Sequence, residues 1–500
     1  MKTINKIFVV VFAILIAMPL IFSDKVGGKV STNENRQLSY FPSLVDENGN
    51  LSFKGFPSAF EQWINDNVGF REGIVKLDSY IDYHVFNTAS NDRIRIGKDG
   101  YNFYAWDNNL DIPKGTYPIN DAVLEKIKVN QERIQRALKA KGIEYVLVLT
   151  PSKASIYPEK IKGANFEVTR TPIDIVADYL KENTTILVIN TKEALLQAKD
   201  EKNVYFKTDT HWNEEGAYEV YKQIINELNE KQIISSKPVQ VDLVEGTYKG
   251  EISAMLGNYN LFDAEKINKT VIRNAKAVNV DNPNLMGLAD TVQVGHNLLP
   301  GRHYFAKNDS INEKDVLIYG DSFFGSWNIN QLLSENFSKL SFIWSDYIKN
   351  EIVDTVKPKI LVFERTERFI NTLAQDCDPR LFAAPLEVGD NQFIDVPDEF
   401  DFNSTVVVVK NLSSSYWSED TMTRLGILPN GNDEGVRVNI EPDRQIMPGE
   451  SYSFNVTDLE RFKDRCSFVD IQMVEEGVKY FGPKLRISLD NGKVTTEEIK

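Results

Sequence analysis

The sequence predicts an α/β domain built on a parallel sheet with helices on both faces, followed by a C-terminal β-sandwich. Two observations carry this prediction. Between residues 120 and 363, segments with helical spacing alternate with short apolar runs, which is the pattern of a parallel sheet. After Pro385, strand-like segments are separated by Asn-Gly, Pro-Gly and Asp-rich turns with little helical pattern, which is typical of a small sandwich.

The α/β domain is predicted to cover residues 57–384 and the sandwich residues 385–500. The predicted helices follow apolar residues at helical spacing and cover residues 57–81, 120–141, 172–182 and 213–228. The predicted strands are the apolar runs 144–149, 185–189, 316–319 and 359–363, and a hairpin is expected over 93–104. Residues 231–312 lack clear periodicity, so insertions or loops around a cleft are expected there.

The N-terminus has the features of an export signal. Lys2 and Lys6 precede an uncharged apolar run from Ile7 to Phe22. Residues 1–23 are therefore interpreted as a signal anchor or a signal peptide, and the poor cleavage site at Ile21-Phe22-Ser23 favours the anchor. Either interpretation places the rest of the chain outside the cytoplasm, with residues 24–56 as a linker.

Composition limits the classes of partner. The formal net charge of −15 argues against nucleic acid or an anionic membrane surface as the main partner, and it is compatible with neutral or amine-bearing sugars without selecting them. Two cysteines, Cys377 and Cys466, exclude a disulfide-rich scaffold and leave open one disulfide or two unpaired thiols. The four histidines are dispersed, so no metal site is predicted, and no cofactor is expected.

The first chemical motif is an Asp-x-His pair on a loop ahead of a helix. In an extended segment, residues two apart project from the same face, about 6–7 Å apart, so the Asp209 carboxylate is placed to orient the His211 imidazole. Asn213 is a suitable N-cap for the helix that follows. On its own, such a pair is as compatible with a structural role as with catalysis.

A candidate nucleophile lies about a hundred residues later. The apolar run 316–319 reads as a buried strand, and Gly320-Asp321-Ser322 follows it. Gly320 is expected to permit a sharp turn that presents Ser322 at the open end of the sheet. A serine needs a neighbouring base to react at neutral pH, so Ser322, His211 and Asp209 form a candidate triad.

Together the two motifs resemble the DHHW family and the alginate O-acetylation proteins with SGNH-hydrolase-like domains. In the usual SGNH hydrolase the Gly-Asp-Ser block comes first, whereas the order here is reversed, as in this circularly permuted acetyltransferase branch. The resemblance extends over about residues 30–375. Further matching segments are Glu34-Asn35-Arg36, Phe60-Glu61-Gln62-Trp63-Ile64-Asn65-Asp66, Gly69-Phe70-Arg71, Gly97-Lys98-Asp99-Gly100-Tyr101, Pro151-Ser152-Lys153 and Tyr157-Pro158.

The resemblance implies an SGNH-hydrolase-like fold and acyl transfer through an acetyl-serine. The backbone N–H of Ser322 or Phe323 is the expected oxyanion donor, and Arg365 is a further candidate, although beside Glu364 it is equally suited to an ion pair. The Asn block of ordinary SGNH hydrolases has no identifiable counterpart. Trp212 is a candidate for substrate contact, and a role in supporting the loop is favoured.

The predicted function is O-acetylation of a cell-envelope or secreted polysaccharide outside the cytoplasm, with a multi-pass membrane acyltransferase implied as the acetyl donor. Two alternatives stay open: an acetyl esterase with the same triad, and a non-catalytic polysaccharide-binding or assembly protein. By analogy with the alginate proteins, the sandwich is a candidate carbohydrate-binding module. Tyr416 and Trp417 are candidates for stacking on sugars, with the sandwich core as their alternative location and protein docking as an alternative role for the domain.

Overall fold

The structure is a computed structural model that describes most of the chain. The described residues are 2–31, 36–45, 51, 53–163, 170–289, 303–374, 391–413, 416–419, 421–442, 444–476 and 479–497. Cys377, His296 and the predicted domain boundary at residues 384/385 lie outside these ranges.

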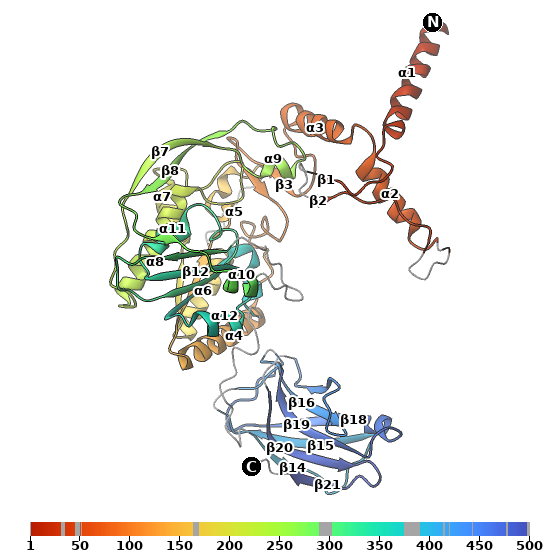
Figure 1. The fold of residues 1–500 in the computed structure, drawn as a ribbon, viewed down its shortest axis with the longest axis vertical. Coiled ribbons are helices and arrows are strands. Elements are labelled where there is room, and N and C mark those ends of the chain that lie inside the picture. Colours follow the sequence, from red (N-terminus) through yellow and green to blue (C-terminus); the bar gives the residue numbers. More distant parts are fainter. Residues whose placement is uncertain are drawn as a thin grey trace.

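A seven-stranded sheet forms the centre of the α/β body (Figure 1), in the order β6-β5-β13-β11-β12-β10-β9. The strands are β5 (Glu144–Thr150), β6 (Leu187–Asn190), β9 (Val278–Asn279), β10 (Tyr304–Lys307), β11 (Val316–Gly320), β12 (Lys339–Trp344) and β13 (Ile360–Thr366). The five strands from β6 to β12 are parallel, which confirms the predicted parallel sheet. Antiparallel pairing of β10 with β12 and of β9 with β10 extends one edge.

Helices cover both faces of this sheet, as predicted. Along β5, Val146 and Val148 point into one core and Leu147 and Leu149 into the other, because successive side chains of a strand face opposite ways. The first core is covered by α7 (Lys192–Lys199), α8 (Glu214–Glu230) and α11 (Ile329–Ser334). The second is covered by α4 (Asp121–Ala140), α6 (Pro172–Asn183), α10 (Pro283–Ala289) and α12 (Asn350–Val356).

The region 231–312 holds more regular structure than expected. It contains the antiparallel pair β7 (Val241–Tyr248) and β8 (Glu265–Ile272), the short helix α9 (Ile252–Met255), and the edge strands β9 and β10. Most of β7 is exposed or half-buried on both faces, so its sequence lacks the apolar alternation that would have marked a strand. The predicted hairpin near residue 100 is confirmed as β3 (Ile94–Ile96) and β4 (Asn102–Tyr104).

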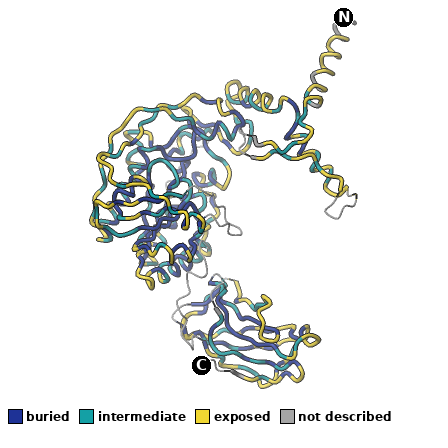
Figure 2. Tube along the Cα trace, viewed as in Figure 1, coloured by how far each residue is buried: buried dark blue, intermediate teal, exposed yellow. Residues whose placement is uncertain are grey.

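The N-terminal segment contains α1 (Lys2–Ile21), α2 (Phe56–Asn67) and α3 (Arg71–Ile81). Figures 1 and 2 show α1 projecting away from the body as an exposed helix. Within the described ranges, no helix is both long enough and apolar enough to span a bilayer. The predicted linker includes β1 (Val30–Ser31) and β2 (Arg36–Gln37), and Ser39 N–H donates to Asp66 Oδ2 of α2 at 2.9 Å.

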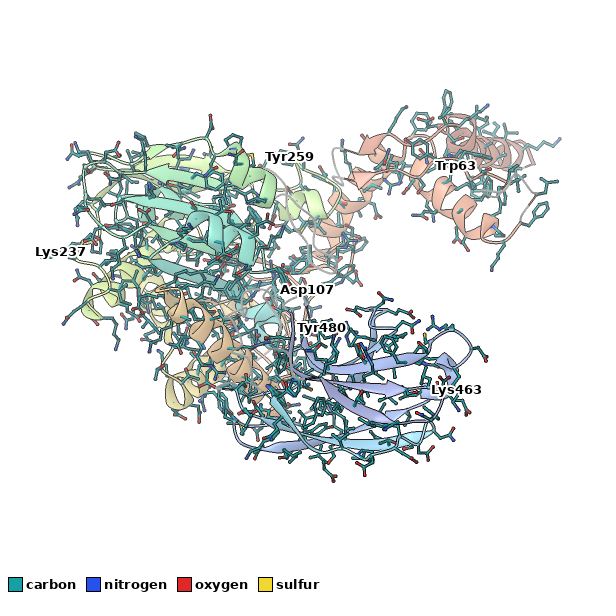
Figure 3. The ribbon with its side chains drawn as sticks, turned by 60° about the horizontal axis from the view of Figure 1, so that its bottom comes forward. Trp63, Asp107, Lys237, Tyr259, Lys463 and Tyr480 are labelled. Carbon is teal, nitrogen blue, oxygen red and sulfur yellow. The ribbon has the colours of Figure 1, made fainter. Side chains whose placement is uncertain are left out.

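The C-terminal β-rich region has the two sheets of a sandwich. One sheet is β14 (Asn391–Asp395), β15 (Ser404–Asn411) and β18 (Ser451–Thr457); the other is β17 (Val436–Asn439), β16 (Thr423–Pro429), β19 (Phe468–Glu475), β20 (Lys479–Ser488) and β21 (Val494–Glu497). Figure 3 shows Lys463 on this region, apart from Trp63 on the N-terminal helices. Cys466 is a half-buried free thiol.

Two aromatic residues of the sandwich were candidates for sugar stacking, and both are buried. Trp417 is 3% exposed and packs in the sandwich core, and Tyr416 is 6% exposed. The Tyr416 hydroxyl donates to Val129 O of α4 at 2.6 Å, and Arg133 of the same helix pairs with Glu475. These aromatics therefore stabilise the core and its contact with the α/β body, which is the alternative that the sequence left open.

Candidate active site

The structure brings the three candidate catalytic side chains into one hydrogen-bonded chain. His211 Nδ1 lies 2.7 Å from Asp209 Oδ1, and His211 Nε2 lies 2.7 Å from Ser322 Oγ. Ser322 follows the carboxyl end of β11, and the other two residues lie on the loop that enters α8. His211 and Asp209 are buried, whereas Ser322 is partly exposed. The arrangement suits proton transfer from the serine hydroxyl to the imidazole.

The loop that carries Asp209 and His211 is held on both sides. Asn213 caps α8, its side chain accepting from Gly216 N–H at 2.9 Å, as the sequence predicted. The buried Lys153 ammonium donates to Phe206 O at 3.1 Å and to Asp209 O. Burial of Lys153 lowers its pKa to about 8. This lysine belongs to the Pro-Ser-Lys segment of the family resemblance, and its contacts assign it a positioning role.

The carboxylate of Asp209 is held by groups that were not among the site residues predicted from the sequence. Its Oδ2 accepts from the Tyr248 hydroxyl at 2.6 Å and from Glu251 N–H at 3.1 Å. Burial alone would raise the pKa of Asp209, but these hydrogen bonds and the one to His211 outweigh it and lower that pKa. A Cβ on Gly250 would lie 1.9 Å from Thr208 O, so only glycine permits this approach.

The turn before Ser322 needs glycine for a reason different from the expected one. Gly320 does not adopt a positive φ. A Cβ at this position would lie 2.9 Å from Glu364 Oε2, which accepts from Asp321 N–H at 3.0 Å. Close packing against the buried Glu364 side chain, and not a strained turn, therefore favours glycine at this position. Burial, with the nearby charge of Asp321, raises the pKa of Glu364 well above its usual range.

Trp212 is fully buried, 0% exposed, with its ring 4.9 Å edge-on from the ring of Phe323. Phe323 in turn lies 4.9 Å from the His211 imidazole. A buried indole has no surface to offer a substrate, so its position favours support of the loop over substrate contact.

Arg365 was a candidate oxyanion donor, but it lies buried among structural contacts. It is 1% exposed on β13, its Nη2 donates to Asp346 O at 2.8 Å, and its guanidinium stacks on Phe363. Phe363 belongs to the core on the face of the sheet opposite Phe323. These contacts give Arg365 a structural role in that face.

Another arginine, Arg368, lies beside the triad. It lines a hollow of about 10 Å³ together with Thr210, Phe323, Asn109 and Ser152. Within the part of the chain that the structure describes, Arg368 Nε, Asn109 Oδ1 and Ser152 Oγ are buried without hydrogen-bond partners. Buried polar atoms are normally paired, so three such atoms around one hollow indicate a site for a small polar group. Arg368 follows the end of β13. No motif in the sequence singled it out as a site residue.

Asp209, His211 and Glu251 each place one ligand atom within 4.8 Å of the others. This spacing reflects the hydrogen-bonded triad, since His211 Nδ1 and Asp209 Oδ1 bond each other. Glu251 Oε1 lies 3.6 Å from His211 Nδ1 and accepts from the Thr210 hydroxyl.

The ionisation of His211 leads to a testable pH dependence. Burial alone would lower the pKa of His211, but the hydrogen bond and charge of Asp209 outweigh it and raise that pKa above 6.5. Since an imidazolium cannot accept the serine proton, acyl transfer should be lost as the pH falls through this raised pKa. We expect kcat/KM for an activated acetyl ester, measured from about pH 5 to 9, to rise through one ionisation.

The matched variant is Asp209→Asn, which removes the charge that raises the His211 pKa. Its pH midpoint should move to lower pH, and its plateau rate should fall. A profile that is flat through the acid range, or an unchanged midpoint in Asp209→Asn, would contradict the assignment of His211 as the base.

A protein-family model and several known proteins are similar to this chain. Residues 94–299 match the family described as SGNH hydrolase-like domain, acetyltransferase AlgX. The probable alginate O-acetylase AlgJ of Pseudomonas fluorescens is 25% identical over 331 residues, covering 62% of this chain and 77% of the relative. The O-acetyltransferase domain of Pseudomonas putida AlgJ aligns with a TM-score of 0.40 and 16% identity, over 56% of this chain and 92% of the domain. A DHHW family protein from Eubacterium siraeum aligns with a TM-score of 0.39 and 12% identity, over 57% and 95% of the two chains.

The family match and the curated relative confirm the resemblance predicted from the motifs. The fold is SGNH-hydrolase-like, with a β-rich C-terminal region. The protein is an O-acetyltransferase.

Proposed function

We propose that the protein transfers acetyl groups to hydroxyls of a cell-envelope or secreted polysaccharide outside the cytoplasm, through Ser322, His211 and Asp209. Its likeness to alginate O-acetylases supports polysaccharide O-acetylation as the general activity. The observation that carries the mechanism is the chain of two 2.7 Å hydrogen bonds from Asp209 through His211 to Ser322. This chain is what an activated serine nucleophile requires.

The first half-reaction acetylates the enzyme. His211 Nε2 takes the proton of the Ser322 hydroxyl while Oγ forms a bond to the carbonyl carbon of the acetyl donor. The bond between that carbon and the donor's leaving group then breaks, and the leaving group takes the proton from His211. Asp209 keeps the Nδ1–H group of His211 oriented, and it stabilises the His211 imidazolium that exists between these steps.

The second half-reaction releases the acetyl group to the acceptor. His211 removes the proton of a sugar hydroxyl, whose oxygen bonds to the acetyl carbon. The bond from that carbon to Ser322 Oγ breaks, and the serine oxygen recovers the proton. The products are an O-acetylated sugar and the free enzyme, which is ready for another donor.

The negative charge that develops on the acetyl oxygen needs donors. Phe323 N–H donates to Asp321 Oδ1 at 2.9 Å, so of the two expected backbone donors it is the Ser322 N–H that we assign to the oxyanion. The guanidinium of Arg368 lines the adjacent hollow and supplies a second donor. A cation held in a partly buried site stabilises developing charge more strongly than it would in water.

The acetyl donor and the location are further parts of the proposal. A multi-pass membrane acyltransferase is the proposed donor, since the family resemblance implies one. The two N-terminal lysines followed by the apolar residues of α1 support export and attachment of the protein to the cytoplasmic membrane, or secretion if the segment is cleaved. Ile7 and Phe8 on this helix are exposed, as a lipid-facing segment would be.

An esterase with the same residues is the second candidate, because the triad serves water as readily as a sugar hydroxyl. A transferase must hold its acceptor so that the hydroxyl outcompetes bulk water. Effective molarities of well-oriented groups reach roughly 10⁵ M or more, which is enough for that competition.

The experiment supplies an activated acetyl donor, with and without an oligosaccharide acceptor. It measures both the acetyl groups on the oligosaccharide and the free acetate released. We expect acetyl groups on the oligosaccharide, detected by mass spectrometry, to form faster than free acetate, and only slow acetate release without acceptor. Rapid acetate release from an acetylated oligosaccharide, with no transfer to any acceptor tried, would favour the esterase.

A further inference from the structure

A groove of about 830 Å³ opens beside the triad. Its walls come from α3, from the segment before β3, from Trp106 after β4, and from α9 with the residues around it. It reaches the catalytic loop at Glu251, whose N–H bonds Asp209 and whose carboxylate lies 3.6 Å from His211 Nδ1. Ligand clefts commonly measure about 300–1,000 Å³, so this groove has room for an oligosaccharide, which an acetyl group alone does not need.

The groove walls are tied together by specific contacts. Ser79 of α3 donates to Leu256 O beyond α9, and Asn91 Nδ2 donates to Met255 O at 2.9 Å. Gly257 adopts a φ of +77°, and a Cβ there would lie 2.5 Å from Val75 Cγ1. These contacts hold the two sides at a fixed separation, which is the condition for a preformed binding site.

An aromatic platform stands in this groove. Trp106 is 42% exposed, whereas Trp212 and Trp344 of the α/β body are buried. The guanidinium of Arg93 lies 4.6 Å from the ring centroid and covers one face of the indole. The stacked arginine fixes the ring, and the remaining exposed indole surface is suited to contact the apolar face of a sugar ring.

The charged side chains of the groove are mainly acidic. Asp78, Asp92 and Glu251 contribute three carboxylates, against the single guanidinium of Arg93 stacked on Trp106. Such a lining repels a polyanion, and because the Debye length is about 8 Å at physiological ionic strength, the repulsion acts across the groove. It attracts an ammonium group and leaves neutral sugars unaffected.

We propose that this groove binds the acceptor glycan and selects uncharged or amine-bearing sugars over uronates. The proposal rests on the proposed function, since it takes the groove that reaches Glu251, beside His211, as the acceptor site. It separates this protein from relatives that are named for alginate, a polyuronate. Trp106 supplies the stacking surface, and Asp78 and Asp92 supply the discrimination by charge.

The test is direct binding of three oligosaccharides of equal length to the full chain, measured by calorimetry: a neutral β-1,4-glucan, a deacetylated chito-oligosaccharide and an oligomannuronate. We expect the amine-bearing ligand to bind at least about tenfold more tightly than the uronate at low salt. The difference should shrink in about 1 M salt, where the Debye length falls to about 3 Å.

Variants of Trp106 and of the two aspartates show which side chains carry the binding and the selection by charge. Trp106→Ala should weaken binding of the amine-bearing and neutral ligands by about tenfold or more, as removal of an anchoring tryptophan does at other interfaces, whereas Trp106→Phe should retain most of the affinity. Asp78→Asn combined with Asp92→Asn should weaken the amine-bearing ligand and strengthen the uronate. Asp458→Asn, on the distant β-rich region, is the matched control and should change neither affinity.

Turnover of a small activated acetyl ester is measured in parallel because it needs the triad but no glycan. Equal affinity for uronate and amine-bearing ligands at low salt, unchanged in the double variant, would overturn the charge selection. Unchanged binding in Trp106→Ala would overturn the groove as the glycan site. Absence of ester turnover in the wild type, with glycan binding intact, would instead count against the proposed catalytic function.

Discussion

Replacing Ser322 with Ala should lower turnover of an activated acetyl ester by about 10⁴-fold or more, because removal of an activated nucleophile typically costs several orders of magnitude. In the structure Ser322 Oγ lies 2.7 Å from His211 Nε2, and no other hydroxyl is recorded within hydrogen-bond distance of that nitrogen among the described residues. His211→Ala should cause a loss of similar size, since the two side chains act as one unit. Wild-type enzyme treated with the donor should also gain one acetyl group at Ser322, detected by peptide mass spectrometry.

The control for this loss is Ser404→Ala, which removes an exposed serine of the β-rich region and should leave turnover unchanged. Circular dichroism should show that Ser322→Ala is folded, because Ser322 lies on a partly exposed turn. Full ester turnover in a folded Ser322→Ala, or acetylation of a different residue, would exclude the covalent mechanism.

The second large effect is expected at Arg368. Arg368→Met should lower kcat for the activated ester by about 100-fold, the usual cost of losing one oxyanion donor, with a much smaller change in KM. Arg368→Lys should recover part of the loss, because it restores the positive charge without the planar group. This split between kcat and KM separates stabilisation of the transition state from simple substrate binding.

Two other arginines serve as comparisons for Arg368. Arg170→Met removes an exposed arginine paired with Asp178 and should leave both kinetic constants unchanged. Arg365→Met removes a buried guanidinium bonded to Asp346 O, so we expect a lower melting temperature without a selective loss of kcat. A selective loss of kcat in Arg365→Met, with wild-type kcat in Arg368→Met, would reverse the two assignments.

Local features of the sequence were sufficient to predict much of the fold. The apolar runs at 144–149 and 316–319 are central strands, and the Asn213 cap begins α8 where expected, because strand burial and helix capping depend on neighbouring residues. The same holds for the pairing of Asp209 with His211, which are two residues apart on one loop. Their contact with Ser322 followed from the chemistry of an activated serine and from the expectation that both motifs lie at the carboxyl ends of strands.

Only the tertiary structure decided which groups surround the triad. Tyr248 and Glu251 reach Asp209 from the region that shows no periodicity, and they do so because the β7–β8 hairpin folds back over the loop. The sequence made Arg365 a candidate and did not single out Arg368, but Arg365 is buried against Phe363 on β13, whereas Arg368 follows the end of that strand and lines the hollow. Contacts between residues far apart in the chain depend on the path of the whole backbone. Residue spacing specified the candidate nucleophile and the candidate base, whereas three-dimensional packing specified the groups that hold their side chains in place and the groove beside them.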